Sequence, residues 1–349
     1  MEKKRVTLRD VAKKANVSVA TVSIVINGNN QMRIREKTRQ RILDVARELN
    51  YQPDLNAQIL KGKTSSMIGL LIPDITNPFY PEVVRGVTDK ANSLGYNVIL
   101  FNSDNKLEQE AFFIDTLKSL KVAGVIICGV DDGGEQEAAL LATLDRDGIP
   151  VVAVDRGVLN GKIPSVMIEN REACFEAVEY LIKGGHKRIA FVETGQSVGI
   201  MEDRFRGYKE ALEAYGLEVS KDLFYHLKST NLEYLHQANG LVKKIRRAKP
   251  KITAIFATAD VVAIEIIRAA KQLNIRVPED LSVIGFDDIQ LAELIDPPLT
   301  TVWQPKYEMG QISMIVLNSM IKEELVAQKT VILAPKFIPR KSAQSLKEA

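Results

Sequence analysis

Polar side chains that can form paired hydrogen bonds recur at the ends of short apolar runs along this 349-residue chain. Groups such as carboxylates, carboxamides and guanidinium suit the vicinal hydroxyls of a sugar, because each makes two hydrogen bonds at once. Phe79, Tyr80 and Trp303 could stack on the apolar faces of a sugar ring. The polar positions are Asp74, Asn77, Ser103, Asp104, Asp155, Arg156, Asn170, Asp260, Asp287 and Gln304, with Arg204 added from a predicted helix start. A cap or turn role remains open for each one, but their recurrence at strand ends favours a ligand site.

The residue sets of common enzyme sites are missing from the sequence. The histidines His186, His226 and His236 are too scattered for a metal site or a catalytic triad. The two cysteines, Cys128 and Cys174, form neither a disulfide framework nor a metal-binding spacing. No G-x-G-x-x-G follows a strand and no phosphate-binding loop is present, so the glycine-rich stretch CGVDDGGEQ is expected to be a loop. These observations disfavour an enzyme and predict no metal or cofactor.

The chain from Met67 onward supplies a scaffold in which apolar runs of strand length alternate with helical patterns. The first runs are MIGLLIP, NVILFNS, GVIICGV and VVAVDR, and a second series is SVMIE, RIAFVET, FYHLK, TAIFAT and LSVIGFD. Apolar strands separated by helices predict an α/β fold with parallel sheets covered on both faces. Two such series predict two doubly wound α/β lobes of the periplasmic-binding-protein type. A ligand would bind between the lobes, where strand carboxyl ends meet.

The first 52 residues follow a different pattern, that of three short helices around a small core. Apolar residues spaced three and four apart mark one face of each helix: Leu8, Val11, Ala12 and Ala15; Val22, Val25 and Ile26; Ile42, Val45, Ala46 and Leu49. Thr7 and Asp10 have the spacing of a capping box, and Ser18 can cap the second helix. The tight turn ANVS between two of these helices predicts a helix-turn-helix head.

The outward face of the second helix carries small or uncharged side chains: Val19, Ala20, Ser23, Ile24 and Asn27. A helix in a DNA major groove can use such side chains to touch thymine methyl groups and base edges. Basic residues that suit phosphates lie on the flanks: Arg9, Lys13, Arg33, Arg35 and Arg39. Residues 1–63 hold 14 Lys and Arg against 6 Asp and Glu, and the remainder holds 33 against 38. A basic head on a mildly acidic body is expected if only the head meets a polyanion.

A linker follows the head in the stretch NYQPDLNAQILKGKTSS (50–66), where Pro53 ends the head. The segment DLNAQILK is too short for a stable helix alone in water. It is either a plain linker or a hinge helix that folds on DNA and inserts Leu60 into the minor groove. Asn56 and Ala57 in the same segment are further expected DNA contacts.

The stretches VTLRDVAKKANVSVATVSIVIN, TRQRILDVARELNYQP and AQILKGK resemble the LacI/GalR family of bacterial transcription regulators, and the resemblance covers nearly the whole chain. It implies base reading by Val19, Ala20 and Ile24. It implies backbone contacts or support of the reading helix for Thr21, Ser23 and Asn27. Thr7 and Arg35 are further expected DNA contacts of the head. Leu60 would be the minor-groove lever. Ile24 and Gln58 stand where many members carry Arg, which affects the outer bases of the operator.

The body resembles periplasmic sugar-binding proteins, especially the ribose type. The matching motifs TNPFY, VDR, RFRGY, IGFDD and WQP imply the following effector contacts: Asn77, Phe79, Tyr80, Asp155, Arg156, Arg204, Asp287 and Gln304. Asn170 and Asp260 complete the expected set. The usual Asn-Asp after TAIFAT is here Ala259-Asp260, so one ligand hydrogen bond is missing and the expected ligand is not ribose.

The expected domains are a helix-turn-helix head (1–52), a hinge helix and linker (53–65), and a ligand-binding and dimerisation core (66–349). By analogy, lobe 1 would comprise about 66–163 and 297–326, and lobe 2 about 164–296 and 327–341, with three crossings between them. The helix GQISMIVLNSMIKEEL (310–325) and the helix near residues 80–94 are expected at a dimer interface, with core packing as the alternative. The short polar tail after Arg340 disfavours a tetramerising coiled coil.

These features together predict a homodimeric repressor on a palindromic operator, controlled by a sugar or sugar derivative acting as inducer or corepressor. An alternative within the family is a global carbon-catabolite regulator with a phosphorylated carrier protein as corepressor, because the NSD and GHKRIAFV segments resemble those members. A solute-binding protein is disfavoured by the basic head. The N-terminus MEKKRVTLRD has no apolar run after it, which predicts the cytoplasm.

Overall fold

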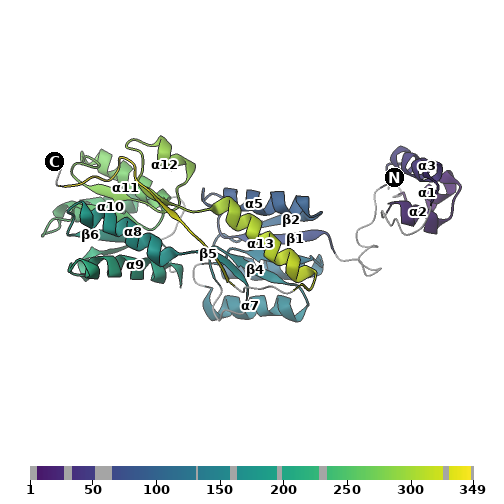
Figure 1. The fold of residues 1–349 in the computed structure, drawn as a ribbon, viewed down its shortest axis with the longest axis horizontal. Coiled ribbons are helices and arrows are strands. Elements are labelled where there is room, and N and C mark those ends of the chain that lie inside the picture. Colours follow the sequence, from purple (N-terminus) through teal and green to yellow (C-terminus); the bar gives the residue numbers. More distant parts are fainter. Residues whose placement is uncertain are drawn as a thin grey trace. The chain divides into compact units, whose positions relative to one another are not determined.

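The structure is a computed structural model, and it describes residues 6–26, 34–51, 65–130, 133–157, 163–194, 199–227, 234–324 and 330–346. The chain divides into two compact units, residues 1–65 and 66–349 (Figure 1). The expected hinge helix at 54–61 lies outside the described residues. Within the described ranges, no helix is long and apolar enough to cross a membrane.

The first unit contains the three predicted helices: α1 (Leu8–Ala15), α2 (Val19–Ile26) and α3 (Glu36–Glu48). Their predicted apolar faces meet in one small core whose fully buried members are Val11, Ala12, Ala15, Val22, Val25 and Ile42. The capping box is confirmed, because the Thr7 backbone N–H donates to Asp10 Oδ2 at 2.8 Å and the Asp10 N–H donates to Thr7 Oγ1 at 3.4 Å. Ser18 caps α2 by accepting the Thr21 N–H at 3.1 Å.

The first lobe of the second unit is built on a six-stranded parallel sheet, with the strand order β11-β5-β4-β3-β1-β2. The strands are β1 (Met67–Ile72), β2 (Asn97–Asn102), β3 (Gly124–Ile127), β4 (Val151–Val154), β5 (Ser165–Ile168) and β11 (Thr330–Leu333). Successive side chains point to opposite faces, and the inner strands β1, β3 and β4 are buried on both faces, whereas the edge strands β2 and β11 are partly exposed. The helices α5 (Tyr80–Ser93) and α13 (Lys306–Ile321) cover one face. The other face is covered by α6 (Leu107–Ser119) and α7 (Gly134–Arg146).

The second sheet is parallel and four-stranded, in the order β7-β6-β8-β9. Its strands are β6 (Ile189–Thr194), β7 (Phe224–Leu227), β8 (Ala254–Ala257) and β9 (Ser282–Ile284). One face packs on α8 (Asn170–Lys183) and α9 (Ile200–Ala214). The other face packs on α10 (Tyr234–Arg247) and α11 (Asp260–Gln272). The predicted fold of two doubly wound lobes is therefore confirmed.

The expected lobe boundaries require a correction, because β5 and β11 belong to the first sheet. Ser165 of β5 pairs with Ala153 of β4, and Thr330 of β11 pairs with Ser165. The strands β10 (Thr301–Trp303) and β12 (Lys336–Ile338) form an antiparallel pair that bridges to the second sheet at Asp287↔Trp303. The three crossings between lobes thus follow β5, β10 and β11. The expected boundaries at 163, 297 and 327 were wrong because strand pairing, which decides lobe membership, depends on distant residues.

The helices α5 and α13 cross at two glycines. A Cβ on Gly86 would lie 2.1 Å from the Tyr307 carbonyl oxygen, and a Cβ on Gly310 would lie 2.2 Å from the Val83 carbonyl oxygen. Only glycine permits backbones to approach so closely. Core packing between these helices, which was the alternative to a dimer interface, is therefore present, although Ile315 of α13 remains 44% exposed.

Candidate ligand site and DNA-binding face

Arg204, in α9, lies at the centre of the expected ligand residues and is almost fully buried. Its Nε donates to Asn170 Oδ1 at 2.8 Å, and its Nη1 donates to the Thr258 carbonyl at 2.6 Å. Its guanidinium carbon lies 3.7 Å from the centroid of the Phe286 ring. Burial lowers the pKa of Arg204, and the charges of Asp287 and Asp155 partly oppose this shift. The fold thus brings three predicted residues, Asn170, Asp155 and Asp287, close to one guanidinium group.

Asp287 and Gln304 form a second part of the same cluster. The Gln304 side-chain N–H donates to Asp287 Oδ1 at 2.7 Å. Burial raises the pKa of Asp287 to about 8, while the neighbouring Arg204 opposes the shift. The Gln304 Oε1 atom is buried, and among the described residues it has no hydrogen-bond donor. Because a buried acceptor without a donor is costly, this atom is suited to accept a hydrogen bond from a ligand hydroxyl.

The backbone at two predicted residues is strained. Asp155 follows β4 with φ +67°, and Asp287 follows β9 with φ +124°. Residues other than glycine rarely adopt such angles, and when they do the position is often functional. Both aspartates are largely buried, at 7% and 6% exposure. Both stand at the carboxyl ends of parallel strands, where ligands bind in sheets of this order.

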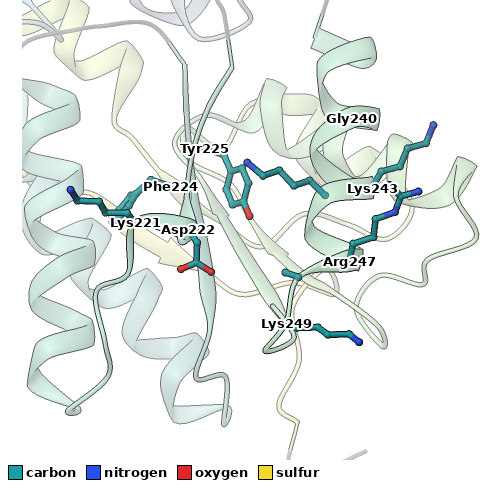
Figure 2. Close-up of a pocket in the computed structure, with 10 residues that line it drawn as sticks. Lys221, Asp222, Phe224, Tyr225, Gly240, Lys243, Arg247 and Lys249 are labelled. Atoms are coloured by element: carbon teal, nitrogen blue, oxygen red, sulfur yellow. The ribbon is translucent and has the colours of Figure 1, made fainter.

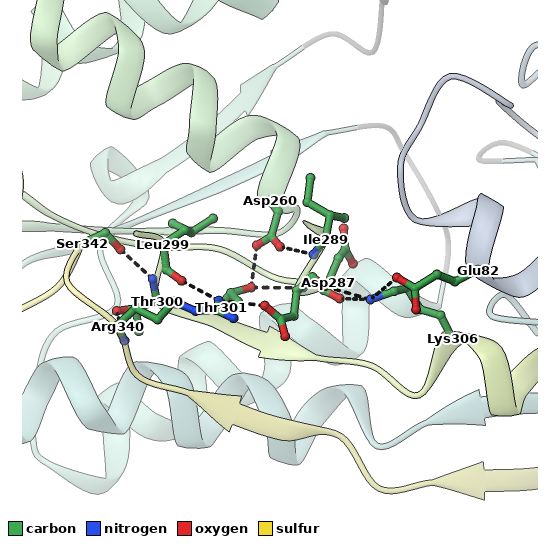
Figure 3. Close-up of polar contacts among 11 residues, drawn as sticks. Glu82, Asp260, Asp287, Ile289, Leu299, Thr300, Thr301, Lys306, Arg340 and Ser342 are labelled. Atoms are coloured by element: carbon green, nitrogen blue, oxygen red, sulfur yellow. Dashed lines mark hydrogen bonds and ion pairs between the residues drawn. The ribbon is translucent and has the colours of Figure 1, made fainter. Parts of the chain in front are cut away.

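Asp260 has a structural role in holding two loops. Its side chain accepts the Ile289 N–H at 2.9 Å and the Thr301 hydroxyl at 2.5 Å (Figure 3). It is fully buried, which raises its pKa to about 6. Since both carboxylate oxygens already accept protein donors, Asp260 positions the Asp287 loop and β10.

The residues expected from the loop after the first strand make contacts within the protein. Asn77 Oδ1 accepts the Phe79 N–H at 3.0 Å, which is the turn role left open for it. Phe79 and Tyr80 are buried in the core and pack edge to face, with ring centroids 5.2 Å apart. Arg156 Nη1 donates to the Gly129 carbonyl at 2.9 Å.

Lys306 was missed from the sequence, although its side chain is only 1% exposed. Its Nζ donates to the carbonyl of Asp287 at 2.6 Å and to the carbonyl of Asp288 at 3.0 Å. The same Nζ lies 3.5 Å from Glu82 Oε1 of α5 (Figure 3). Lys306 therefore ties the loop after β9 in the second lobe to a helix of the first. A lysine at a helix start suggests a solvated charge, so the sequence did not single out Lys306. The available signal for a functional role was its position two residues after Gln304, at a crossing between lobes.

A buried pair of glutamates was also missed. Glu110 of α6 and Glu137 of α7 are 1% and 6% exposed. Glu137 Oε1 accepts the Val130 N–H at 3.0 Å. Burial, together with the charge of Glu137, raises the pKa of Glu110 to about 8. Among the described residues no group of three or more His, Cys, Asp and Glu side chains could hold a metal ion.

The predicted DNA-reading face of α2 is accessible in part. Val19 is 42% exposed, Ala20 is exposed, and the others are half-buried: Thr21, Ser23 and Ile24. The exposed Arg35 precedes α3, and Thr7 caps α1. Four expected DNA contacts lie outside the described residues: Asn27, Asn56, Ala57 and Leu60. The outward side chains of α2 thus carry no charge, as expected for a helix in a major groove.

Sequence comparison assigns both units. Residues 7–54 match the family described as "Bacterial regulatory proteins, lacI family", and residues 178–343 match a "Periplasmic binding protein-like domain". The ribose operon repressor of Halalkalibacterium halodurans is 36% identical over 97% of each chain. The chain belongs to the LacI family. Catabolite control protein A of Priestia megaterium is 35% identical over 97% of this chain and 99% of its own.

Solved structures of LacI-family proteins have the same fold. The lac repressor dimer bound to operator and the anti-inducer ONPF has a TM-score of 0.84 at 26% identity, covering 98% of this chain and 100% of its own. A LacI family regulator from Enterococcus faecium with bound ribose has a TM-score of 0.70 at 28% identity, covering 80% of this chain and 99% of its own. This LacI-family chain is a DNA-binding transcription regulator with a sugar-binding type of body, and not an enzyme.

Proposed function

We propose that this LacI-family regulator is a repressor whose operator affinity is set by a sugar or sugar derivative bound around Arg204. The observation that carries the site is the buried Gln304 Oε1, which has no hydrogen-bond donor in the part of the chain that the structure describes. The neighbouring polar groups are the guanidinium of Arg204 and the carboxylates of Asp287 and Asp155, which suit vicinal hydroxyls. Strained backbone at both aspartates supports a binding role.

The route from ligand to DNA runs, in this proposal, through the crossings between lobes. Lys306 contacts the carbonyl of Asp287 in one lobe and Glu82 in the other. A ligand that draws in the Asp287 side chain also moves this carbonyl, and the lobes then turn as rigid bodies about the crossings. The hinge at residues 53–65 joins the head to this body, so lobe rotation would favour or disfavour the DNA-bound form.

The effector is proposed to differ from ribose at one contact. Relatives include a ribose operon repressor, and a related regulator was solved with ribose. In this chain Ala259 precedes α11 and has no side-chain amide to offer to a hydroxyl. We infer a sugar or sugar derivative that lacks the hydroxyl facing this position, or that places an apolar group there.

The DNA-binding form is proposed to be a homodimer on a palindromic operator. A related lac repressor was solved as a dimer on its operator. Two heads related by a twofold axis require two half-sites of inverted sequence. The exposed Ile315 of α13 and the adjacent surface of α5 are the proposed interface. Because operator DNA is its partner, we infer that the protein acts in the cytoplasm.

Selection of bound sites from a random DNA library by the purified full-length protein tests the proposal. Enrichment of a palindrome with two half-sites is the expected result. Candidate sugars are then titrated against the selected operator, and one of them should change the dissociation constant by about tenfold or more. Enrichment of a single asymmetric site, or an operator affinity that no sugar or sugar derivative changes, would contradict it.

A second candidate is a carbon-catabolite regulator that uses a phosphorylated carrier protein as corepressor. The similarity to catabolite control protein A of Priestia megaterium favours this alternative. The measurement is operator binding with and without the phosphorylated carrier protein. Tighter operator binding that requires the phosphoryl group would establish this function, and equal binding would leave the sugar-controlled repressor.

A further inference from the structure

A cavity of about 670 Å³ opens on the second lobe, and it is formed by elements that contribute nothing to the Arg204 cluster. Its walls come from the short helix η1 (Lys221–Leu223), the strand β7 and the carboxyl-terminal half of α10. The charged residues on these walls are Lys221, Asp222, Lys243, Lys244, Arg247 and Lys249 (Figure 2). Five of the lining residues are thus cationic and one is a carboxylate, and Figure 2 shows the side chains of Lys243 and Arg247 pointing the same way, away from Lys221.

The one carboxylate does not neutralise the cavity. Asp222 forms an ion pair with Arg188, which is not part of the wall. Within the described part of the chain, no carboxylate pairs with Lys221, Lys243 or Arg247. The body of the protein has an excess of acidic residues, yet residues 243–251 read KKIRRAKPK. Like charges held around one cavity repel each other, and a bound anion relieves this repulsion.

Helix stabilisation alone does not account for the cluster. Lys244 and Arg247 lie in the last turn of α10, where cations interact favourably with the helix dipole. Lys221 and Lys249 line the cavity from outside this helix, and Lys221 belongs to a different element, η1. Lys244 Nζ lies 5.0 Å from the centroid of the Tyr225 ring, so part of the wall is held in place by a cation–π contact.

We propose that this cavity binds a small phosphate-bearing anion. Lysine ammonium groups act as point charges for phosphate, and the Arg247 guanidinium adds a fork that matches phosphate geometry. The volume lies in the range of small-molecule pockets. Phe224 and Tyr225 add apolar wall beside the cations. The site is separate from the effector cluster, so the regulator has a second input of different chemistry.

The test is calorimetric titration of the full-length protein with inorganic pyrophosphate. The variant Lys243→Gln/Arg247→Gln removes two exposed cations of the wall. The control Lys187→Gln/Lys271→Gln removes two exposed cations of the same lobe that lie outside the cavity. Saturable binding should weaken by about tenfold or more in the cavity variant and should be unchanged in the control. Because all three proteins carry the same basic head, the difference between them localises the site.

Two outcomes would overturn the inference. One is equal pyrophosphate affinity in all three proteins, or an absence of saturable binding to the wild type. The other is a loss of operator affinity in the cavity variant without any change in pyrophosphate binding, which would make the surface a DNA contact. Because the four replaced side chains are exposed, we expect the variants to fold normally. Circular dichroism of each variant checks this.

Discussion

The side-chain amine of Lys306 donates a hydrogen bond of 2.6 Å to the backbone carbonyl of Asp287. The two residues belong to different parts of the chain, since Asp287 follows the last strand of the second sheet and Lys306 begins a helix that packs on the first. Asp287 also carries the carboxylate that Gln304 contacts. Asp287 thus offers its side chain to the proposed ligand site and its backbone carbonyl to the connection between lobes.

Replacement of Lys306 by Met should reduce both stability and allosteric coupling. The substitution leaves the buried carbonyl oxygen of Asp287 and the partly buried one of Asp288 without this donor, and we expect the free energy of unfolding to fall by about 3 kcal/mol. Urea unfolding measures this loss, and effector titration against operator DNA should show a smaller change in affinity than in the wild type. Lys322→Met, at the exposed end of the same helix, is the control. Unchanged coupling in Lys306→Met would contradict the proposed route.

Replacement of Arg204 by Lys should weaken effector binding by about tenfold or more while leaving effector-free operator binding unchanged. Lysine keeps the charge but cannot hold Asn170 and the Thr258 carbonyl through two different nitrogens. Fluorescence or calorimetric titration with the identified effector measures the loss. Arg171→Lys, which alters an exposed pair with Glu210, is the matched control. Equal effector affinity in both variants would exclude Arg204 from the site.

Replacement of Ala259 by Asn should have two separable effects. Ala259 is the N-cap of α11 and makes no side-chain capping hydrogen bond, so Asn should stabilise the protein by about 1 kcal/mol. The new amide should also increase affinity for ribose. Ala259→Ser supplies the cap without the amide, so thermal unfolding and ribose titration of the two variants distinguish the effects. A gain in ribose affinity in the Ser variant, or in neither, argues against the missing contact.

Stability should fall as pH rises from about 5 to about 9, and Glu110 should cause part of this fall. The folded pKa of Glu110, about 8, lies above the model-compound value of 4.5, so the folded state holds a proton that the unfolded state releases. The contribution is complete below pH 4.5 and is lost as pH rises through 8. Glu110→Gln mimics the protonated form, so its stability relative to the wild type should increase by a few kcal/mol over this range. Denaturation curves at several pH values measure it, with the exposed Glu108→Gln as control.

Replacement of Gly310 by Ala should destabilise the protein by about 1 to 3 kcal/mol, because the new Cβ would meet the Val83 carbonyl oxygen at 2.2 Å. Gly240→Ala provides a comparison within another helix. No atom lies within 4 Å of its Cβ position, so the change should stabilise the protein by about 0.5 to 1 kcal/mol. Opposite signs of the two shifts in thermal midpoint are expected. A neutral Gly310→Ala would mean that the two helices can separate without cost.

The sequence predicted the strands β1 to β9 of the two parallel sheets because each is a short apolar run bounded by polar residues, but it did not predict β11. Their partners could not be predicted in the same way. SVMIE was predicted as a strand, but its pairing with β4 could not be predicted from its own residues. Hydrophobic periodicity is a local property, whereas strand order depends on long-range contacts. The lobe boundaries were wrong for this reason.

The candidate site shows the same division. Asp287 and Gln304 were recognisable as planar polar groups after strands, and Arg204 as one at a helix start; the structure brings them together. Lys306 and Glu110 were not, because charged residues in helical patterns suggest a solvated surface. Burial of such a charge becomes visible only when its neighbours are known. Phe79 and Tyr80 were expected to contact ligand, yet their rings lie in the core.

The two cysteines lie on opposite sides of the crossings. Cys128 follows β3 in the first lobe and Cys174 lies in α8 of the second; both are buried and free. Burial raises the pKa of each thiol, so neither reacts readily in the folded protein. Each lobe therefore contains its own natural reporter, and the rate of thiol labelling followed by mass spectrometry would record the opening of each lobe separately. The unmodified protein can thus show whether effector binding stiffens both lobes together or only one.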